Sequence, residues 1–472
     1  MLLSVSGRSA RTGLAVASAL AVTALVALGG PANGTVTGTA PLDPPLGACS
    51  GPACPGTFPP ANNGDFAGRD ASINIFVGGD YLARNRAAEA EGRIVTLGDL
   101  TIDKTGGGGF NMGVVGVGSR VPPPDGTDFV AVGGSVDIRS GNTLLLGGSD
   151  SKGDAWGNLR HGGTLTGTTS IDPPGQAIHD TTVRSTYAPL RSTIEERSAC
   201  AAEATATGTV TITASEATFA GDGTSALQVF DVPGDIGGDR TIGLAFTGIP
   251  AGATVLVNML GTSPTINTYT GSGVPGDPTT DLQPRLMWNF PNATSAAIRG
   301  SAQFQGSVLA GRAAGTTTIA APGLNGRVYL AGGLIQEGSG GYELHAYPFT
   351  GVLPICTTPT PTTSAPTATP TTPSPTPTTP SPTPTNGTPG PTDSSAHPAT
   401  STPGPGPSTT APATGGSSSA GHGPSGQPTV RPGQLADTGE QSTLLTVLLP
   451  AGLLLTGGGV LRVVRRRQGR HS

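Results

Sequence analysis

The sequence predicts a mainly β fold: an irregular right-handed β-helix or solenoid with one flanking α-helix. Short runs of Val, Ile, Leu and Thr recur between glycine-rich turns, and aromatic residues make up only 4% of the chain. Strands this short, with so few aromatic side chains, suit stacked coils whose core is filled by small aliphatic residues. No fixed repeat length is visible, so we expect irregular coils. A β-sandwich is the alternative.

The predicted strands share alternating or continuous aliphatic and β-branched residues bounded by glycine. They are GRIVTLGDLTID (92–103), DFVAVGGSVDI (128–138), NTLLLGGSD (142–150), GTVTITAS (208–215), ATVLVNMLG (253–261), QGSVLAG (305–311), TTTIAAPG (316–323) and GRVYLAGG (326–333). One segment, TYAPLRSTIEERSACAAEATA (186–206), predicts a helix instead, because Tyr187, Leu190 and Ile194 fall on one face. We expect that face to pack along the flank of the solenoid.

The chain divides into compositional regimes. Residues 1–32 are predicted to be a signal peptide, because Arg8 and Arg11 precede an apolar run that ends in small residues. Residues 41–356 hold nearly all the aromatic and charged residues and form the predicted β domain. Residues 357–434 are rich in Pro, Ser and Thr and have almost no large apolar side chains, which predicts a disordered linker long enough to cross a cell wall.

A short motif follows this linker at residues 435–439. It consists of Leu435, Ala436, Asp437, Thr438 and Gly439. Leu-Ala-x-Thr-Gly resembles the signals that class E sortases of high-GC Gram-positive bacteria cut, here between Thr438 and Gly439. The sortase cysteine would attack the Thr438 carbonyl, and an amine of peptidoglycan would then replace the enzyme.

The segment after the motif supports this interpretation. Residues 443–464 are apolar over a length that could span a bilayer, which predicts a transmembrane sorting helix. Residues 465–472 form a basic cytoplasmic tail, in which Arg465, Arg466 and Arg467 would retain the precursor at the membrane. The mature protein is therefore expected to be secreted and anchored covalently to the cell wall.

Export would place the cysteines in an oxidising compartment, where disulfides persist. The candidates are Cys49, Cys54, Cys200 and Cys356, and sequence alone leaves three pairings open. We favour Cys49–Cys54 as a small loop and Cys200–Cys356 as a link near the end of the β domain. A metal site is disfavoured, because CSGPAC has no second closely spaced Cys or His pair to complete it.

The predicted β domain resembles the choice-of-anchor A domain proteins of bacterial surfaces. The matching stretches are INIFVGGDYL (73–82), AEGRIVTLGDL (90–100), FQGSVLAG (304–311) and the closing run between Ala321 and Pro354. Ile73 stands where the family often has Phe. The resemblance covers most of residues 60–356 and implies a secreted, adhesin-like β module with a variable C-terminal attachment device. It implies no catalytic residues.

A catalytic or metal site is not predicted from the residues either. Carboxylates and imidazoles that could serve a β-helix polysaccharide lyase or glycosidase are Asp80, Asp99, Asp103, Asp137, His161, His179 and His345. Asp in GGD and LGD contexts is typical of Asx turns at solenoid corners. Lys152 lies between Asp150 and Asp154, which favours a solvated loop over a calcium site. No cofactor is expected.

Three function classes remain. The first is an adhesin that binds an extracellular glycan, matrix protein or surface; the second is a wall-tethered carbohydrate-active enzyme; the third is a passive coat component. Thr-rich strands could bind glycans or ice, but their irregular spacing argues against an ice ladder. Nucleic acid is excluded as a partner, because the net charge is −5 and the signal and tail segments carry much of the arginine.

The sortase interpretation makes a direct prediction. Thr438→Ala removes the threonine side chain from the motif that the sortase recognises. The variant should therefore stay in the membrane fraction, and so should the wild-type protein in a strain without the sortase. Muramidase digestion followed by immunoblotting measures the wall-linked form. Failure to release any such form from wild-type cells would contradict the motif.

Overall fold

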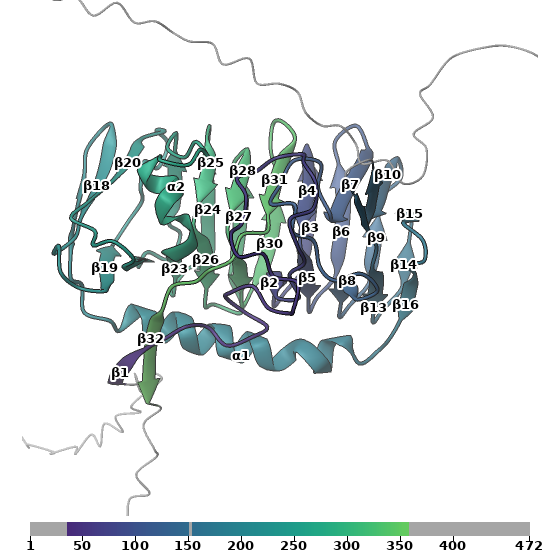
Figure 1. The fold of residues 1–472 in the computed structure, drawn as a ribbon, viewed down its shortest axis with the longest axis horizontal. Coiled ribbons are helices and arrows are strands. Elements are labelled where there is room, and N and C mark those ends of the chain that lie inside the picture. The colour runs from purple at the N-terminus through teal and green to yellow at the C-terminus, as the bar shows by residue number, and fades with distance from the viewer. Residues whose placement is uncertain (1–34, 151–152, 358–472) are drawn as a thin grey trace, which may run out of the picture. The chain divides into compact units, whose positions relative to one another are not determined.

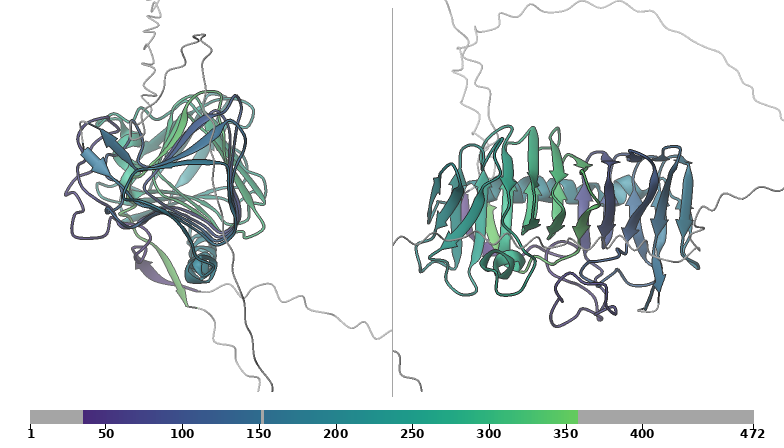
Figure 2. Two further views of the ribbon diagram at one scale, coloured as in Figure 1. Left: turned by 90° about the vertical axis from the view of Figure 1, so that its right-hand side faces the viewer. Right: turned by 90° about the horizontal axis from the view of Figure 1, so that it is seen from above.

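The computed structural model describes residues 35–150 and 153–357, which form a parallel β-solenoid of triangular cross-section (Figures 1 and 2). Three long sheets make its faces, and within each of them the paired strands run parallel, as the strands of the first two coils already do. The prediction of a mainly β solenoid is confirmed, whereas the right-handedness of its coils stays a prediction. The β-sandwich alternative is wrong for these residues, because sandwiches are built from antiparallel sheets.

The three long sheets have ten, eight and seven strands. In spatial order, the ten-stranded sheet contains β16 (Ala177–His179), β13 (Asn158–His161), β8 (Asp128–Val132), β5 (Arg93–Thr96), β2 (Ile73–Val77), β29 (Val328–Leu330), β26 (Ser307–Ala310), β23 (Leu286–Phe290), β21 (Thr254–Met259) and β19 (Leu227–Val232). The eight-stranded sheet contains β14 (Leu165–Thr166), β9 (Val136–Ile138), β6 (Leu100–Lys104), β3 (Tyr81–Asn85), β30 (Gly333–Gln336), β27 (Thr316–Ala320), β24 (Ser295–Gly300) and β22 (Thr265–Thr268). The seven-stranded sheet contains β15 (Thr168–Ile171), β10 (Asn142–Leu146), β7 (Gly108–Gly113), β4 (Ala87–Glu91), β31 (Tyr342–His345), β28 (Gly323–Asn325) and β25 (Gln303–Gln305).

Smaller elements complete the described chain. They are the antiparallel pairs β1 (Thr35–Ala40) with β32 (Leu353–Thr357) and β11 (Gly148–Asp150) with β12 (Gly153–Ala155), the three-stranded sheet β17 (Thr209–Ile212), β18 (Glu216–Ala220) and β20 (Gly243–Thr247), the helices α1 (Val183–Ala202) and α2 (Pro278–Leu282), and the 3-10 helix Gln283–Arg285. Each predicted strand segment contains at least one observed strand.

The coils are not stacked in sequence order. The first coil, β2 to β4, lies in the middle of the solenoid, and later coils extend from it toward β16. The chain then passes along α1 to the opposite end and builds back until the last coil, β29 to β31, pairs with the first. Figure 1 shows α1 running along the length of the solenoid, across the direction of the strands, to connect the two halves. The sequence analysis did not predict this discontinuity.

Helix α1 confirms the predicted flanking helix, with an earlier start at Val183 and an end at Ala202. Ile194 is buried, and Tyr187 and Leu190 pack against the same outer cluster of the ten-stranded sheet. Twenty residues rise about 30 Å, enough to cross about six strands of a sheet. Asn289 Nδ2 donates to the Ser198 carbonyl at 2.9 Å, so polar contacts as well as apolar ones fix the helix to the sheet.

The main core lies inside the triangle and consists of inward Val, Ile, Leu, Ala and aromatic side chains. Near the β19 end it becomes aromatic: Trp288 contacts Phe219 edge-on and Phe304 at a ring-centroid distance of 5.3 Å. The Trp288 Nε1 donates to the Gln305 carbonyl, so this large side chain is buried with its polar atom satisfied.

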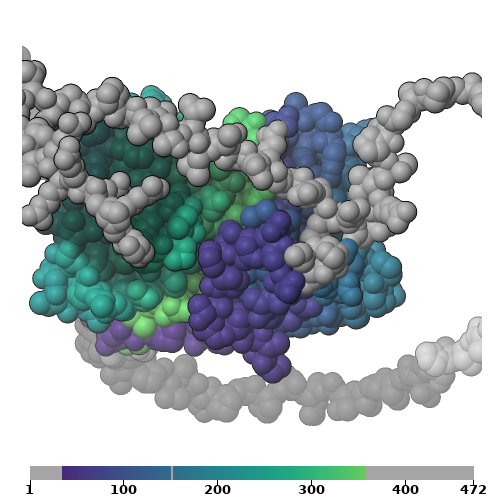
Figure 3. Space-filling view, turned by 45° about the horizontal axis from the view of Figure 1, so that its top comes forward, coloured from purple at the N-terminus to yellow at the C-terminus, as the bar shows by residue number. Residues whose placement is uncertain are grey.

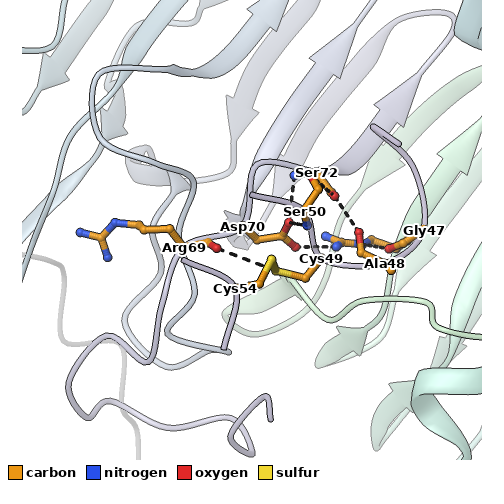
Figure 4. The surroundings of a disulfide bond; sticks show 9 residues. Gly47, Ala48, Cys49, Ser50, Cys54, Arg69, Asp70 and Ser72 are labelled. Carbon is orange, nitrogen blue, oxygen red and sulfur yellow. Dashed lines mark hydrogen bonds and ion pairs between the residues drawn. A yellow bond between two sulfur atoms is a disulfide. The ribbon is translucent and has the colours of Figure 1, made fainter. Parts of the chain in front are cut away.

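The described residues contain two disulfides, of which one links the C-terminal strand to α1 and the other closes a small N-terminal loop. Cys200, near the end of α1, is bonded to Cys356 in β32, and Cys49 is bonded to Cys54. These are the two pairs that the sequence analysis favoured. The Cys49–Cys54 bond lies in an N-terminal loop that packs against the solenoid (Figure 4).

A buried ion pair holds this N-terminal loop. Arg327, which precedes β29, donates to Asp70 Oδ2 at 2.5 Å, and their side chains are only 1% and 3% exposed. Asp70 Oδ1 also accepts from the backbone N–H groups of Ser50 and Ser72 (Figure 4). Arg327 Nε donates to the Gly47 carbonyl, so each charged group is satisfied inside the protein.

Removing one partner of this pair should be strongly destabilising. Arg327→Met leaves Asp70 as a buried, uncompensated charge, and we expect the free energy of unfolding to fall by about 3–5 kcal/mol. Arg139→Met is the matched control, because Arg139 is 58% exposed in its pair with Asp137 and should matter by less than about 1 kcal/mol. Urea denaturation followed by circular dichroism measures both; equal losses would contradict the assignment.

Candidate functional site: an uncovered face of the solenoid

The three faces of the solenoid differ in what lies over them. Helix α1 covers the ten-stranded sheet. The loop after β7 and the N-terminal segment cover the middle of the seven-stranded sheet, where Gly118 pairs with Asn62 and Tyr347 Oη donates to the Pro59 carbonyl. Figure 3 shows the N-terminal segment, in purple, standing out from the surface. On the eight-stranded sheet, by contrast, outward side chains remain accessible.

The outer surface of the eight-stranded sheet, here called the flat face, is built mainly by alternation of buried and outward side chains. In β3, Tyr81 and Ala83 are buried while Leu82 and Arg84 are partly exposed, and β27 repeats the pattern. One outward row crosses all eight strands. From β22 to β14 it reads Thr265, Ala297, Thr318, Ile335, Leu82, Thr101, Asp137 and Thr166.

The chemistry of this row is mostly small and weakly polar. At about 4.8 Å per strand it is about 34 Å long, and no aromatic or long charged side chain interrupts it. Threonine does not form an unbroken ladder, because Ala297, Ile335 and Leu82 stand between the threonines. The irregular spacing expected from the sequence is thus confirmed on the described face.

Ion pairs line the margin of the flat face. Arg84 Nε donates to Glu337 Oε2 at 2.6 Å, and Arg139 pairs with Asp137 at 3.1 Å. All four side chains are partly exposed, so these pairs contribute little to stability and mainly balance the charge of the margin.

On the seven-stranded sheet, polar side chains are buried beneath other segments of the domain. Glu91, 2% exposed, accepts from Ser119 Oγ and from the backbone N–H groups of Ser119, Arg120 and Ala346. These contacts anchor the loop after β7 to the sheet. Sequence analysis missed this role; two glutamates among the alanines of AAEAE are the signal that could have indicated it.

Glu89 lies beside Glu91 on the same strand and is completely buried. Asn111 and the Gly116 backbone N–H donate to its carboxyl group. Burial, followed by the negative charge of Glu343 on the adjacent strand β31, raises the pKa of Glu89 from 4.5 to about 8. Glu89 is therefore protonated at neutral pH.

The Asp residues of the glycine corners have structural roles, although their side chains bond the next coil and do not form the predicted Asx turns. Asp80 Oδ1 accepts from the Asp99 backbone N–H at 2.9 Å, and Asp99 Oδ1 accepts from the Ser135 backbone N–H at 2.7 Å. Each side chain thus bonds the corresponding corner of the next coil. Asp137 pairs with Arg139, and Asp103 is exposed at the margin of the flat face.

The histidines do not join these carboxylates. His161 and His179 lie together near the β16 end, with ring centroids 5.4 Å apart. His345 is buried on the seven-stranded sheet, between Asn325 and Glu343. The residues proposed for the enzyme alternative are therefore spread over corners, the flat face and two other sheets, and they do not converge on one cleft.

The cysteines also group with a carboxylate. Cys49, Cys54 and Asp70 lie close together, but both sulfurs are in a disulfide and Asp70 is bonded to Arg327. A metal ion would need free thiolates, so this group does not fit one. Of the loop considered for calcium, Asp154 is exposed, and residue 152 lies outside the described residues.

The predicted anchoring device also lies outside the described residues. This holds for the signal peptide, the linker, the sortase motif at 435–439, the segment 443–464 and Arg465, Arg466 and Arg467. Within residues 35–150 and 153–357, no helix has the length and apolar character needed to cross a bilayer.

Burial of Glu89 makes stability depend on pH. The folded protein keeps this proton up to about pH 8, whereas the unfolded chain loses it near pH 4.5. The free energy of unfolding should therefore fall as pH rises through this window, by up to about 1.4 kcal/mol per pH unit, and level off above it. Glu89→Gln should flatten the slope in urea titrations, while Asp103→Asn, an exposed control, should keep it. A variant slope equal to that of wild type would refute the assignment.

Comparison with known proteins gives a family. Residues 68–344 match the model of the family described as "Putative Ice-binding-like adhesive domain". A solved structure, the crystal structure of an ice binding protein from an Antarctic biological consortium, matches at 13% identity over 63% of this chain and 95% of that chain, with a TM-score of 0.19. No curated protein matches the chain.

The resemblance to choice-of-anchor A domains stays a prediction. The family match covers more than half of the sequence, and the chain belongs to this ice-binding-like adhesive domain family, as an adhesin-like protein of the extracellular surface.

Proposed function

We propose that this protein is an exported, sortase-anchored adhesin whose flat face binds an extracellular glycan, matrix protein or solid surface. The observation that carries the proposal is the difference between the faces: among residues 35–150 and 153–357, other segments cover two of the sheets but leave outward side chains of the eight-stranded sheet accessible. The family match to adhesive domains supports the same function class and a non-enzymatic role.

The shape of the flat face suits contact with an extended surface. Its outward row is about 34 Å long and its strands are about 15 Å long, which gives an area of about 500 Å². This is smaller than the roughly 800 Å² per partner of a standard protein interface, so one domain would bind weakly. Many copies on one cell would bind strongly, because linked weak contacts add through effective concentration.

The position of the domain's end fits display of this face. Strand β32, which ends at Thr357, lies beside α1 and is bonded to it through Cys200–Cys356 (Figures 1 and 2). The proposed linker to the wall would begin there, on the side that carries the helix. The flat face belongs to a different side of the triangle and would stay free to bind.

Charge on the flat face should abolish adhesion without unfolding the domain. In the double variant Leu82→Lys/Ile335→Lys, two partly exposed apolar residues on adjacent strands become charged. Two desolvated like charges would disfavour contact between the flat face and an apolar surface. We expect at least about a tenfold loss of adherent cells, measured on polysaccharide, matrix-protein and abiotic surfaces against a deletion strain.

Ile212→Lys is the matched control, because Ile212 is 42% exposed on β17, outside the flat face. It should leave adhesion unchanged. Equal adhesion of the double variant and wild type would contradict the assignment of the face. Release of reducing ends from a glycan panel by wild type would favour the enzyme alternative instead.

A further inference from the structure

A groove of about 480 Å³ lies where the flat face meets the seven-stranded sheet. Its volume falls within the roughly 300–1,000 Å³ of small-molecule sites. Its lining combines strand ends and corner turns, and includes Asn267, Arg299, Ala320, Glu337, Ser339 and Tyr342. Several of the lining residues carry hydroxyl, carboxamide or guanidinium groups, and one has an aromatic ring.

The aromatic ring is held in place by a glycine. A Cβ atom at Gly338 would lie 2.1 Å from the Tyr342 ring, so only glycine allows the ring to lie against this turn. The Tyr342 and Ser339 hydroxyl groups lie within hydrogen-bond distance, at 3.1 Å. Tyr342 is partly exposed, so part of its flat ring is accessible from the groove. Such a platform can pack against the C–H groups of a sugar ring.

The opposite wall supplies fixed hydrogen-bonding groups. Arg299 donates through Nη2 to the Gly238 carbonyl at 2.7 Å, while its buried Nε has no hydrogen-bond partner among the described residues. Asn267, on the adjacent strand, is held by the Thr241 hydroxyl and by the same Gly238 carbonyl. The Arg299 side chain as a whole is 42% exposed, so N–H groups of its guanidinium can donate to hydroxyl groups of a ligand in the groove.

The charge of the groove is balanced. Glu337 accepts from both Arg84 and Asn85, and Arg299 lies 3.3 Å from Asp239. Neither sign of charge is left in excess, so the groove does not favour a strongly charged ligand. An uncharged ligand with many hydroxyl groups and one apolar face matches both walls.

We propose that this groove binds a short stretch of a neutral polysaccharide, with one sugar ring packed on Tyr342 and its hydroxyl groups bonded to Arg299 and Asn267. The inference rests on the proposed adhesive function and deepens it, because it assigns a glycan to a site at the margin of the flat face. The groove would bind a segment of one polysaccharide chain, and the adjacent flat face would contact the rest of the polysaccharide surface.

The experiment measures binding of soluble trisaccharides to the purified full-length chain in detergent by titration calorimetry. The probes are cellotriose, chitotriose, mannotriose and xylotriose. We expect saturable binding of at least one of them, with an affinity that does not change with ionic strength. Ala320→Trp fills the groove and Tyr342→Ala removes the platform, and each should weaken binding by at least about tenfold.

Two controls separate this inference from the adhesive function. Ala199→Trp, on the exposed side of α1, is the matched control and should bind the trisaccharide as wild type does. Leu82→Lys/Ile335→Lys should also retain trisaccharide binding, even where it loses adhesion. Absence of saturable binding for all four probes, or binding that survives both groove variants, would overturn the proposal while leaving the flat face untouched.

Discussion

The pairing of β2 with β29 is the contact on which the rest of the structure depends. These strands are more than 250 residues apart in sequence, yet they join the first coil to the last, and the neighbouring pairs β3–β30 and β4–β31 form with them. Without this junction, each half would expose an additional set of unpaired strand edges, which are prone to aggregation. Helix α1 makes the junction possible, because it carries the chain along most of the solenoid toward the opposite end.

Buried polar groups then define how the outer segments attach to this framework. Arg327 and Asp70 fix the N-terminal loop, Glu91 fixes the loop after β7, and Asn289 fixes α1. Each group is fully bonded only when its segment is in place, so a displaced segment would leave a buried charge or amide unsatisfied. The flat face has no comparable group in its outward row, which is consistent with a surface that no segment of the described domain covers.

Local patterns were sufficient to predict much of this fold. Glycine-bounded aliphatic runs indicated the strands, the spacing of Tyr187, Leu190 and Ile194 indicated α1, and the GGD and LGD contexts indicated corner aspartates. The discontinuous coil order was not predictable in this way, because pairing between distant parallel strands leaves no local signal. The flat face and the groove likewise depend on which surfaces other segments cover. The burial of Glu89 and Glu91 has the same origin, because a loop distant from their strand covers them.

The Cys200–Cys356 bond has a mechanical consequence for a protein tethered by its C-terminal side. Load arriving through such a tether enters the domain at β32, which in the described residues pairs only with β1 and could be peeled away one bond at a time. The disulfide bypasses that weak pairing and passes the load covalently into the end of α1. Because α1 lies across many coils, such a pull would be shared among them as shear along the helix, and the strands of the flat face would bear little of it.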